Sequence, residues 1–154
     1  MIKKNDSKFS LDWVLINELA IGKIPYKDEH FNILKEEGIS SILSLCSEKE
    51  FSTSKNLYSD FIHERIVLPD HKSGKVPNIE EILLVLSKLK ELKSFGPVFV
   101  HCIASMERSP MICMGWLIRE HNLNVQEALD YLMNIHPGTN PLKEQIEILE
   151  KLNK

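Results

Sequence analysis

The segment that most constrains the fold of this chain covers residues 98–110 and reads V-F-V-H-C-I-A-S-M-E-R-S-P. It begins with apolar residues, as a buried strand does, and it leads into an apolar stretch at residues 111–119. Pro110 lies where the first turn of a helix tolerates proline. The sequence therefore predicts a strand, a short loop and a helix in direct succession, which is a building unit of α/β proteins.

The loop inside this segment is suited to hold an anion. Because it lies between a strand end and a helix start, its backbone amides can point at one anion, and the positive end of the helix adds to the attraction. The same field favours the thiolate form of the cysteine at the strand end, which could then attack phosphorus in line. The residues predicted to line this cradle are Ile103, Ala104, Ser105, Met106, Glu107 and Arg108.

Three further side chains complete the predicted chemistry. The guanidinium of Arg108 can hold two phosphate oxygens at once. The hydroxyl of Ser109 can hydrogen-bond the sulfur when that sulfur departs from phosphorus. A departing alcohol also needs a proton donor, and Asp70 is the candidate, because it lies in a Pro/Gly-marked loop after the strand-like residues 62–68. The alternative for Asp70 is an aspartate in a surface turn.

These motifs resemble the protein tyrosine phosphatase superfamily, and specifically its small dual-specificity branch. The resemblance rests on H-C-I-A-S-M-E-R-S together with an aspartate upstream in a Pro-Asp loop. It extends to residues 12–22, 41–45 and 137–145. It implies a metal-independent phosphatase whose cysteine becomes phosphorylated during the reaction.

The resemblance also implies a role for individual residues. By this comparison Cys102 is the nucleophile, Arg108 the phosphate clamp, Asp70 the general acid and Ser109 the residue that assists departure of the sulfur. Gln145 falls where some members carry a glutamine that positions water. Cys46 resembles a cysteine that bonds reversibly to the nucleophile in phosphoinositide-directed members, and the alternative is a small buried hydrophobic residue at a strand end.

The sequence departs from the family at Ser105, where glycine is usual. Glycine lets the backbone turn tightly without a clash from Cβ. Either Ser105 is accommodated with modest strain, or the loop is distorted and activity is low. Two neighbours have simpler expectations: His101 should hydrogen-bond to fix the loop rather than transfer protons, and Glu107 should point outward, because a carboxylate inside the cradle would repel phosphate.

The rest of the chain predicts an α/β fold with a central, mostly parallel sheet flanked by helices, as in protein tyrosine phosphatases. Strand and helix patterns alternate, without repeats or low-complexity linkers. Asn78 is expected to cap a long helix. The expected strands cover residues 13–21 as a pair, 41–45, 62–67 and 98–100, and the expected helices cover residues 28–37, 79–92, 111–119, 125–134 and 142–152.

Composition predicts one compact catalytic domain over residues 1–154, with residues 1–9 as a flexible end. The chain of 154 residues is 43% hydrophobic, which is enough apolar material for a single core. A formal net charge of −3 offers no broad basic field for nucleic acid or a membrane surface. Without a signal peptide or an apolar span, and with three cysteines, the chain is expected to be a cytoplasmic monomer. The histidines form no metal-binding motif, so neither a metal nor a cofactor is expected.

The leading hypothesis is a phosphatase that acts on phosphotyrosine, with phosphoserine and phosphothreonine as further substrates, so that its partners are phosphorylated proteins or small phosphomonoesters. One alternative is a phosphoinositide or an RNA 5′-phosphate as substrate, which the acidic and apolar loop I-A-S-M-E disfavours. Another is a phosphate-binding pseudoenzyme in which Ser105 spoils the loop geometry, and the presence of Cys102, Arg108 and Asp70 argues against it.

Overall fold

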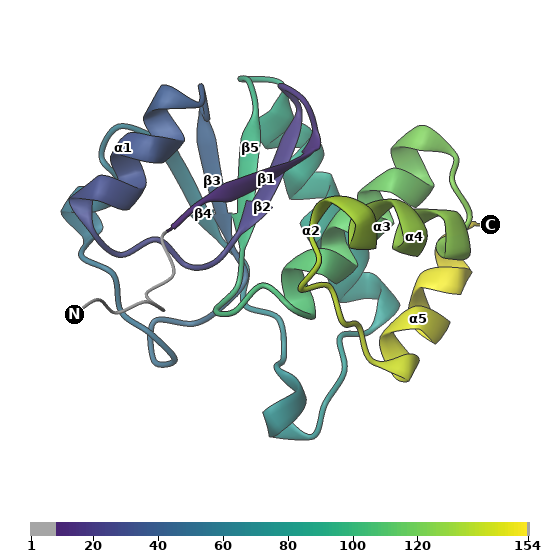
Figure 1. Ribbon diagram of the computed structural model, residues 1–154. Helices are drawn as coiled ribbons and strands as arrows, with labels where there is room; N and C mark the ends of the chain where they lie inside the picture. Colours follow the sequence, from purple (N-terminus) through teal and green to yellow (C-terminus); the bar gives the residue numbers. More distant parts are fainter. Residues whose placement is uncertain (1–8, 154) are drawn as a thin grey trace, which may run out of the picture.

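The computed structural model describes residues 9–153, and the predicted flexible end, apart from Phe9, lies outside the described residues. Its centre is a sheet of five strands in the order β1-β2-β5-β3-β4 (Figure 1). β1 pairs antiparallel with β2, and the other neighbours pair in parallel, so the predicted mostly parallel sheet is confirmed. The strands are β1 (Leu11–Leu15), β2 (Leu19–Gly22), β3 (Ser41–Ser44), β4 (Ile62–Arg65) and β5 (Val98–His101).

Helices cover both faces of the sheet. α1 lies against one face and the other four helices gather on the opposite face (Figure 1). The larger apolar core fills the four-helix side, and a smaller one, which includes Phe31, Tyr58 and Phe99, fills the α1 side. The helices are α1 (Asp28–Glu36), α2 (Ile79–Lys93), α3 (Arg108–His121), α4 (Val125–Ile135) and α5 (Lys143–Leu149). Short 3-10 turns occupy Lys55–Tyr58, His71–Ser73 and Glu150–Asn153.

Two of the helices begin with the same capping arrangement. Asn78 accepts a hydrogen bond from the Glu81 amide at 2.8 Å, and the Glu81 carboxylate accepts one from the Asn78 amide at 2.9 Å. The predicted cap of α2 is thereby confirmed. Asn124 and Glu127 repeat the arrangement at the start of α4, with the same two distances. Each such cap stabilises its helix by about 1 kcal/mol.

Some boundaries differ from those expected. α3 starts at Arg108 rather than at residue 111, so Arg108 and Ser109 belong to its first turn. β4 ends at Arg65, although the amides of Ile66 and Leu68 still bond to the carbonyls of Ser44, the last residue of β3, and of Leu45, which follows it. α5 covers Lys143–Leu149, and a 3-10 turn at Glu150–Asn153 occupies the end of the helix predicted over residues 142–152. The early start of α3 matters most, because it brings the helix N-terminus to the predicted anion loop.

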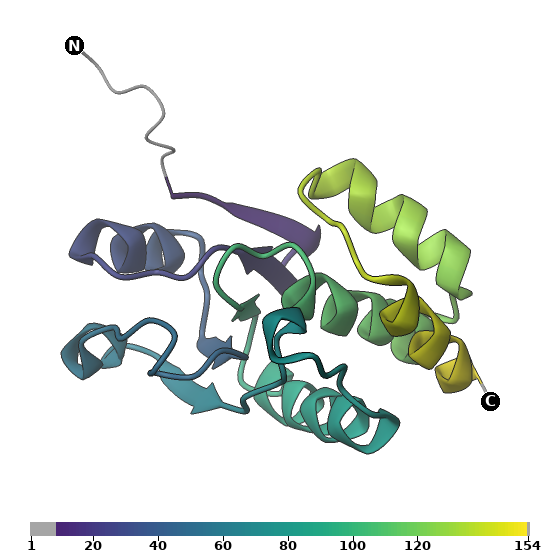
Figure 2. The ribbon, with the colours of Figure 1, turned by 90° about the horizontal axis from the view of Figure 1, so that it is seen from below.

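The carboxyl ends of the parallel strands meet at one edge of the molecule, where α/β proteins place their ligands. Figure 2 looks at this edge, with the loop from β5 to α3 near the centre and the segment containing His71–Ser73 close to it. Within the described range, no helix has the length and apolarity needed to cross a membrane. Residues 9–153 also contain no cluster of three potential metal ligands from His, Cys, Asp or Glu.

Candidate active site

The loop between β5 and α3 is fixed by its carbonyl groups. The carbonyl of Ile103 accepts from the Ile24 amide at 3.2 Å, and the carbonyl of Met106 accepts from the Asn140 amide at 2.7 Å. The carbonyl between them, that of Ser105, accepts from a histidine ring at 2.8 Å. A trans peptide directs its N–H opposite to its C=O, and the described residues contain no cis bond. With these carbonyls held from outside, the amides of residues 104, 106 and 107 face the opposite way, toward the centre of the loop.

These amides border a cavity of about 500 Å³. The sulfur of Cys102 lies 3.3 Å from the hydroxyl oxygen of Ser109, in the first turn of α3. Cys102 is only 3% exposed, so the surrounding protein encloses most of this residue. The residues that line the cavity are Glu50, Asp70, Lys72, Cys102, Ile103, Ala104, Ser105, Met106, Glu107 and Arg108. The structure therefore brings together the predicted thiol, arginine and aspartate, which are separated in sequence.

Arg108 is held by a carboxylate that the sequence did not indicate. Its Nη2 donates to Glu50 Oε1 at 2.7 Å and its Nη1 donates to Glu50 Oε2 at 3.1 Å. Nη1 also donates to the Leu68 carbonyl at 3.2 Å. The recorded bonds of Arg108 in the described chain use Nη1 and Nη2, which leaves the side formed by Nε and the second Nη2 hydrogen for phosphate.

The ion pair between Arg108 and Glu50 favours the charged form of each side chain. The hydrogen bond from Arg108 holds the pKa of Glu50 below its usual value, although partial burial opposes the shift. Burial disfavours the charged guanidinium, yet the bond to Glu50 and the charges of Cys102 and Asp70 raise the pKa of Arg108. A fixed positive fork therefore faces the cavity from a side chain that is nearly enclosed.

Asp70 lies in the cavity wall, at the start of the turn that follows β4. Its carboxylate accepts a hydrogen bond from the Lys72 amide at 3.2 Å, and its carbonyl accepts from the Ser73 amide at 2.9 Å. These bonds form a tight turn of the type that Asp favours. The turn places a carboxyl group opposite the loop that carries Cys102.

His101 supports the loop from beneath. Its Nδ1 lies 2.8 Å from the carbonyl of Cys102, which can only accept, so Nδ1 carries the hydrogen. Burial lowers the pKa of His101 to about 3, so the ring is neutral and Nε2 accepts from the Ser44 hydroxyl at 2.7 Å. The Ser44 oxygen in turn accepts from Nε2 of His63 at 2.9 Å, and burial lowers the pKa of His63 to about 4. This column of neutral groups fixes the carbonyl next to the reactive sulfur.

Ser105 adopts the left-handed conformation that its position requires, with φ of 62°. Serine thus occupies the backbone conformation that glycine usually supplies, and its effect on activity stays a prediction. Its hydroxyl oxygen lies 3.0 Å from that of Ser109. When Cys102 is a thiolate, Ser109 donates to the sulfur and Ser105 donates to Ser109, which extends the hydrogen-bond chain by one group.

The remaining predicted residues lie in different places. Cys46 directs its sulfur at the carbonyl of Cys102, at 3.7 Å, and burial raises the pKa of its thiol. Both cysteines are free thiols, and a disulfide between them stays a prediction. Glu107 is among the cavity-lining residues. Gln145 is not among them: it is buried, and its side-chain oxygen accepts from the Leu142 amide at 2.8 Å, which caps α5.

Sequence reasoning missed Glu50 and the histidine that holds the Ser105 carbonyl, which is His136. Glu50 comes soon after β3, whose carboxyl end lies beside that of β5. The rule that ligands bind at the carboxyl ends of parallel strands could have drawn attention to it. For His136, which precedes a proline at the end of α4, the sequence offered no comparable signal.

Comparison with known proteins identifies the family. The family model described as dual specificity phosphatase, catalytic domain, matches residues 24–154. The chain belongs to this family. The resemblance stated from the motif is thereby confirmed, and it covers most of the chain.

The curated relatives of this dual specificity phosphatase domain include proteins named as lipid phosphatases and proteins named as tyrosine-protein phosphatases. Phosphatidylglycerophosphate phosphatase PTPMT2 of Arabidopsis thaliana is 25% identical over 92% of this chain and 63% of its own length. Tyrosine-protein phosphatase cdc-14 of Caenorhabditis elegans is 28% identical over 80% of this chain, but over only 17% of its own length. The chain thus spans less than two thirds of the first curated relatives it matches.

Solved structures confirm the fold of this phosphatase domain. The active form of Tk-PTP aligns with a TM-score of 0.81 at 21% identity, over 94% of this chain and 96% of that one. PTPMT1 in complex with PI(5)P aligns with a TM-score of 0.77 at 20% identity, over 88% of this chain and 90% of the other. These likenesses confirm the architecture predicted from the sequence.

Proposed function

We propose that this protein is a cysteine-dependent phosphomonoester hydrolase that works through a cysteinyl-phosphate intermediate. The observation that carries the proposal is that Cys102, Arg108, Asp70 and the loop between β5 and α3 line one cavity. Membership of the dual specificity phosphatase family supports the same conclusion.

In the first step the Cys102 thiolate attacks phosphorus, and the bond from phosphorus to the ester oxygen breaks. Protonated Asp70 transfers its proton to that oxygen, so the product leaves as an alcohol. The loop amides and the open side of Arg108 hold the three remaining phosphate oxygens, on which negative charge spreads during transfer. The step yields cysteinyl phosphate and an Asp70 carboxylate.

In the second step a water molecule attacks the phosphorus of the cysteinyl phosphate. The Asp70 carboxylate accepts a proton from this water, and the bond between phosphorus and sulfur breaks. Ser109, 3.3 Å from the sulfur, donates a hydrogen bond to the departing thiolate and makes it a better leaving group. The products are inorganic phosphate and the enzyme in its starting state.

The substrates best matched to this cavity are phosphotyrosine and, with it, phosphoserine and phosphothreonine in proteins. Apart from Arg108, the basic side chain that lines the described cavity is that of Lys72, while Glu50, Asp70 and Glu107 are acidic. A ligand with a single phosphate suits this balance of charge. A ligand with several phosphates would meet carboxylates around the loop.

A phosphorylated lipid headgroup is the second candidate. It is supported by the relatives with the widest coverage, among them rat phosphatidylglycerophosphatase and protein-tyrosine phosphatase 1, which is 23% identical over 93% of this chain. A solved structure of similar fold is described as holding PI(5)P. A headgroup with one phosphomonoester would place the same chemical group in the cradle as phosphotyrosine does.

A substrate panel separates the two candidates. It compares kcat/KM for peptides carrying phosphotyrosine, phosphoserine or phosphothreonine with that for vesicles containing PI(5)P or phosphatidylglycerophosphate. We expect the highest kcat/KM with phosphotyrosine peptides. A higher kcat/KM with either lipid would overturn this choice and establish the lipid as the substrate class.

Substitution of the nucleophile tests the activity itself. Cys102→Ser should abolish hydrolysis of an aryl phosphate such as p-nitrophenyl phosphate, because a serine hydroxyl is far less ionised than a thiol and leaves poorly from phosphorus. Cys113→Ser is the matched control: Cys113 is buried on α3, outside the cavity lining, and should keep its turnover. Retained turnover in Cys102→Ser would refute the assigned nucleophile.

A further inference from the structure

Ser105 needs an external constraint to hold its backbone. With φ of 62°, it occupies the left-handed region that residues with a Cβ adopt rarely. Rotation of the peptide that joins it to Met106 would turn a carbonyl oxygen into the cradle and remove one inward-facing amide. Phosphate would then meet an acceptor in place of a donor. The loop can therefore bind an anion only while this peptide keeps its orientation.

The side chain of His136 supplies that constraint. It follows the end of α4 and is only 9% exposed. Its Nε2 lies 2.8 Å from the carbonyl oxygen of Ser105, and its Nδ1 lies 2.6 Å from Oδ2 of Asp12, on β1. The ring thus bridges the outer strand of the sheet and the back of the anion loop. It holds the carbonyl of the peptide between Ser105 and Met106, whose orientation decides whether the loop offers an amide or a carbonyl to phosphate.

The two acceptors define the protonation state of the ring. A carbonyl can only accept a hydrogen bond, and an ionised carboxylate can only accept. A ring that donates to both oxygens carries a hydrogen on each nitrogen. Among the described residues Asp12 is the charged partner recorded on this ring, while the backbone of His136 bonds to Leu132 and Thr139.

We propose that Asp12 and His136 form a positioning pair that keeps the peptide between Ser105 and Met106 in the orientation that binds phosphate. The proposal rests on the proposed phosphatase function, because it assigns the pair to the loop of that site. The doubly protonated ring also places a positive charge behind the loop, which strengthens the attraction for a dianion. Neither residue lines the cavity, so both act through the loop and neither touches the substrate.

Two substitutions of the same residue separate the two bonds. The amide nitrogen of asparagine can replace Nδ1, so His136→Asn keeps the bond to Asp12 and loses the bond to Ser105. The amide nitrogen of glutamine can replace Nε2, so His136→Gln keeps the bond to Ser105. We expect His136→Asn to lower kcat/KM for p-nitrophenyl phosphate about 100-fold, because small displacements of reacting groups have effects of that size. Its inhibition constant for tungstate should rise about tenfold. His136→Gln keeps the bond to Ser105 but loses the bond to Asp12 and the ring charge, so it should lose about tenfold in kcat/KM, less than His136→Asn.

A second substitution tests whether the pair acts through backbone strain. Glycine adopts positive φ without a clash, so Ser105→Gly in the His136→Asn background should recover about tenfold in kcat/KM. Ser105→Ala is the matched control: it removes the same hydroxyl but keeps Cβ, and it should recover nothing. Equal losses in His136→Asn and His136→Gln, or equal recovery with glycine and alanine, would overturn the proposal.

Two measurements distinguish this proposal from the phosphatase function. Nitrogen-15 NMR of the His136 ring, assigned by comparison with His136→Gln, should show hydrogen on both nitrogens at the assay pH, and a ring with one bare nitrogen would overturn the pair. Tungstate binding measured by calorimetry should weaken in His136→Asn with the predicted tenfold change. If the wild type hydrolyses no phosphomonoester, the proposed function fails, while the binding and NMR results still decide on the positioning pair.

Discussion

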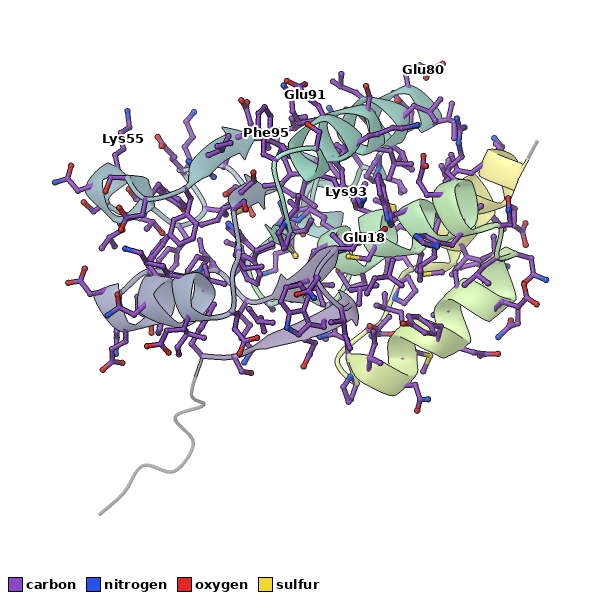
Figure 3. The ribbon with its side chains drawn as sticks, turned by 90° about the horizontal axis from the view of Figure 1, so that it is seen from above. Glu18, Lys55, Glu80, Glu91, Lys93 and Phe95 are labelled. Carbon is purple, nitrogen blue, oxygen red and sulfur yellow. The ribbon has the colours of Figure 1, made fainter. Side chains whose placement is uncertain are left out.

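The two ends of the sheet each carry a hollow, and the two differ in how their polar groups are used. The cavity at the carboxyl end measures about 500 Å³ and the one at the amino end about 410 Å³. Figure 3 looks at the amino end, where Glu18 and Lys93 are labelled. The second hollow is lined by Glu18, Lys90, Lys93, Ser94, Trp116, Glu120 and His121.

At the amino end the central carboxylate already has its partners. Glu18 accepts from Nε1 of Trp116 at 2.7 Å and from Nε2 of His121 at 2.9 Å. At the carboxyl end Glu50 occupies one side of Arg108, and the other side, like the loop amides, faces the cavity. The two cavities therefore differ in the polar groups that they offer to a ligand, although their volumes are similar. Donors aimed at one point in the cavity, rather than the size of the hollow, distinguish the candidate active site.

Among the substitutions that test the contrast between the two cavities, we expect the largest effect at Asp70, which lies in the wall of the cavity at the carboxyl end. Asp70→Asn should lower kcat for an alkyl phosphate by about 100-fold or more, because an alkoxide leaves poorly without a proton. The same variant should lose only about threefold with p-nitrophenyl phosphate, whose leaving group is already stable as an anion. Steady-state kinetics on both substrates measures the difference.

The comparison of leaving groups is the internal control for that variant. Misfolding of the turn around Asp70 would lower both activities by the same factor. Equal losses on the alkyl and the aryl phosphate would therefore count against proton donation by Asp70.

An intermediate effect is expected at the ion pair beneath the cavity. Glu50→Gln replaces the two charge-assisted acceptors with one neutral one, so Arg108 keeps its charge but loses its fixed orientation. We expect kcat/KM for p-nitrophenyl phosphate to fall about tenfold. Glu48→Gln, in the same loop and exposed, is the matched control and should leave the rate unchanged. An increase in rate with Glu50→Gln would mean that this carboxylate competes with phosphate for the arginine.

The smallest expected effect lies at the amino end. Glu18→Gln should leave kcat/KM unchanged and lower the free energy of unfolding by about 1 kcal/mol, measured by urea denaturation at neutral pH. Burial opposes the shift, yet the bonds from His121 and Trp116 lower the pKa of Glu18 below its usual 4.5. A depressed pKa stabilises the native state above that value, so the difference between variant and wild type should shrink as the pH falls below about 4.5. A change in catalytic rate would show that the two hollows are coupled.

Local sequence patterns were sufficient to predict most of the fold. Asn78 and Glu81 lie three residues apart, and Asn78 caps α2 as expected. The apolar runs in the sequence also predicted where the parallel strands lie. The start of α3 was missed by three residues, because helix ends depend on how nearby groups are capped rather than on periodicity. Pro110 marked the first turn but not its first residue.

The candidate site was predictable where its residues share one short segment. Cys102, Arg108 and Ser109 fall within the loop and the first turn of α3, so their spacing carried the chemistry. Glu50 lies 58 residues before its partner Arg108, and Asp12 lies 124 residues before His136. Such pairs arise from the packing of distant segments, and a single sequence holds no periodic signal for them.

The histidine column below Cys102 has a consequence for how the enzyme responds to acid. The pKa values of His101 and His63, near 3 and 4, lie well below the range in which a phosphatase is assayed. A titration of catalytic rate between pH 5 and pH 8 would therefore leave this scaffold uncharged throughout. Any inflection in that profile would therefore come from groups other than His101 and His63.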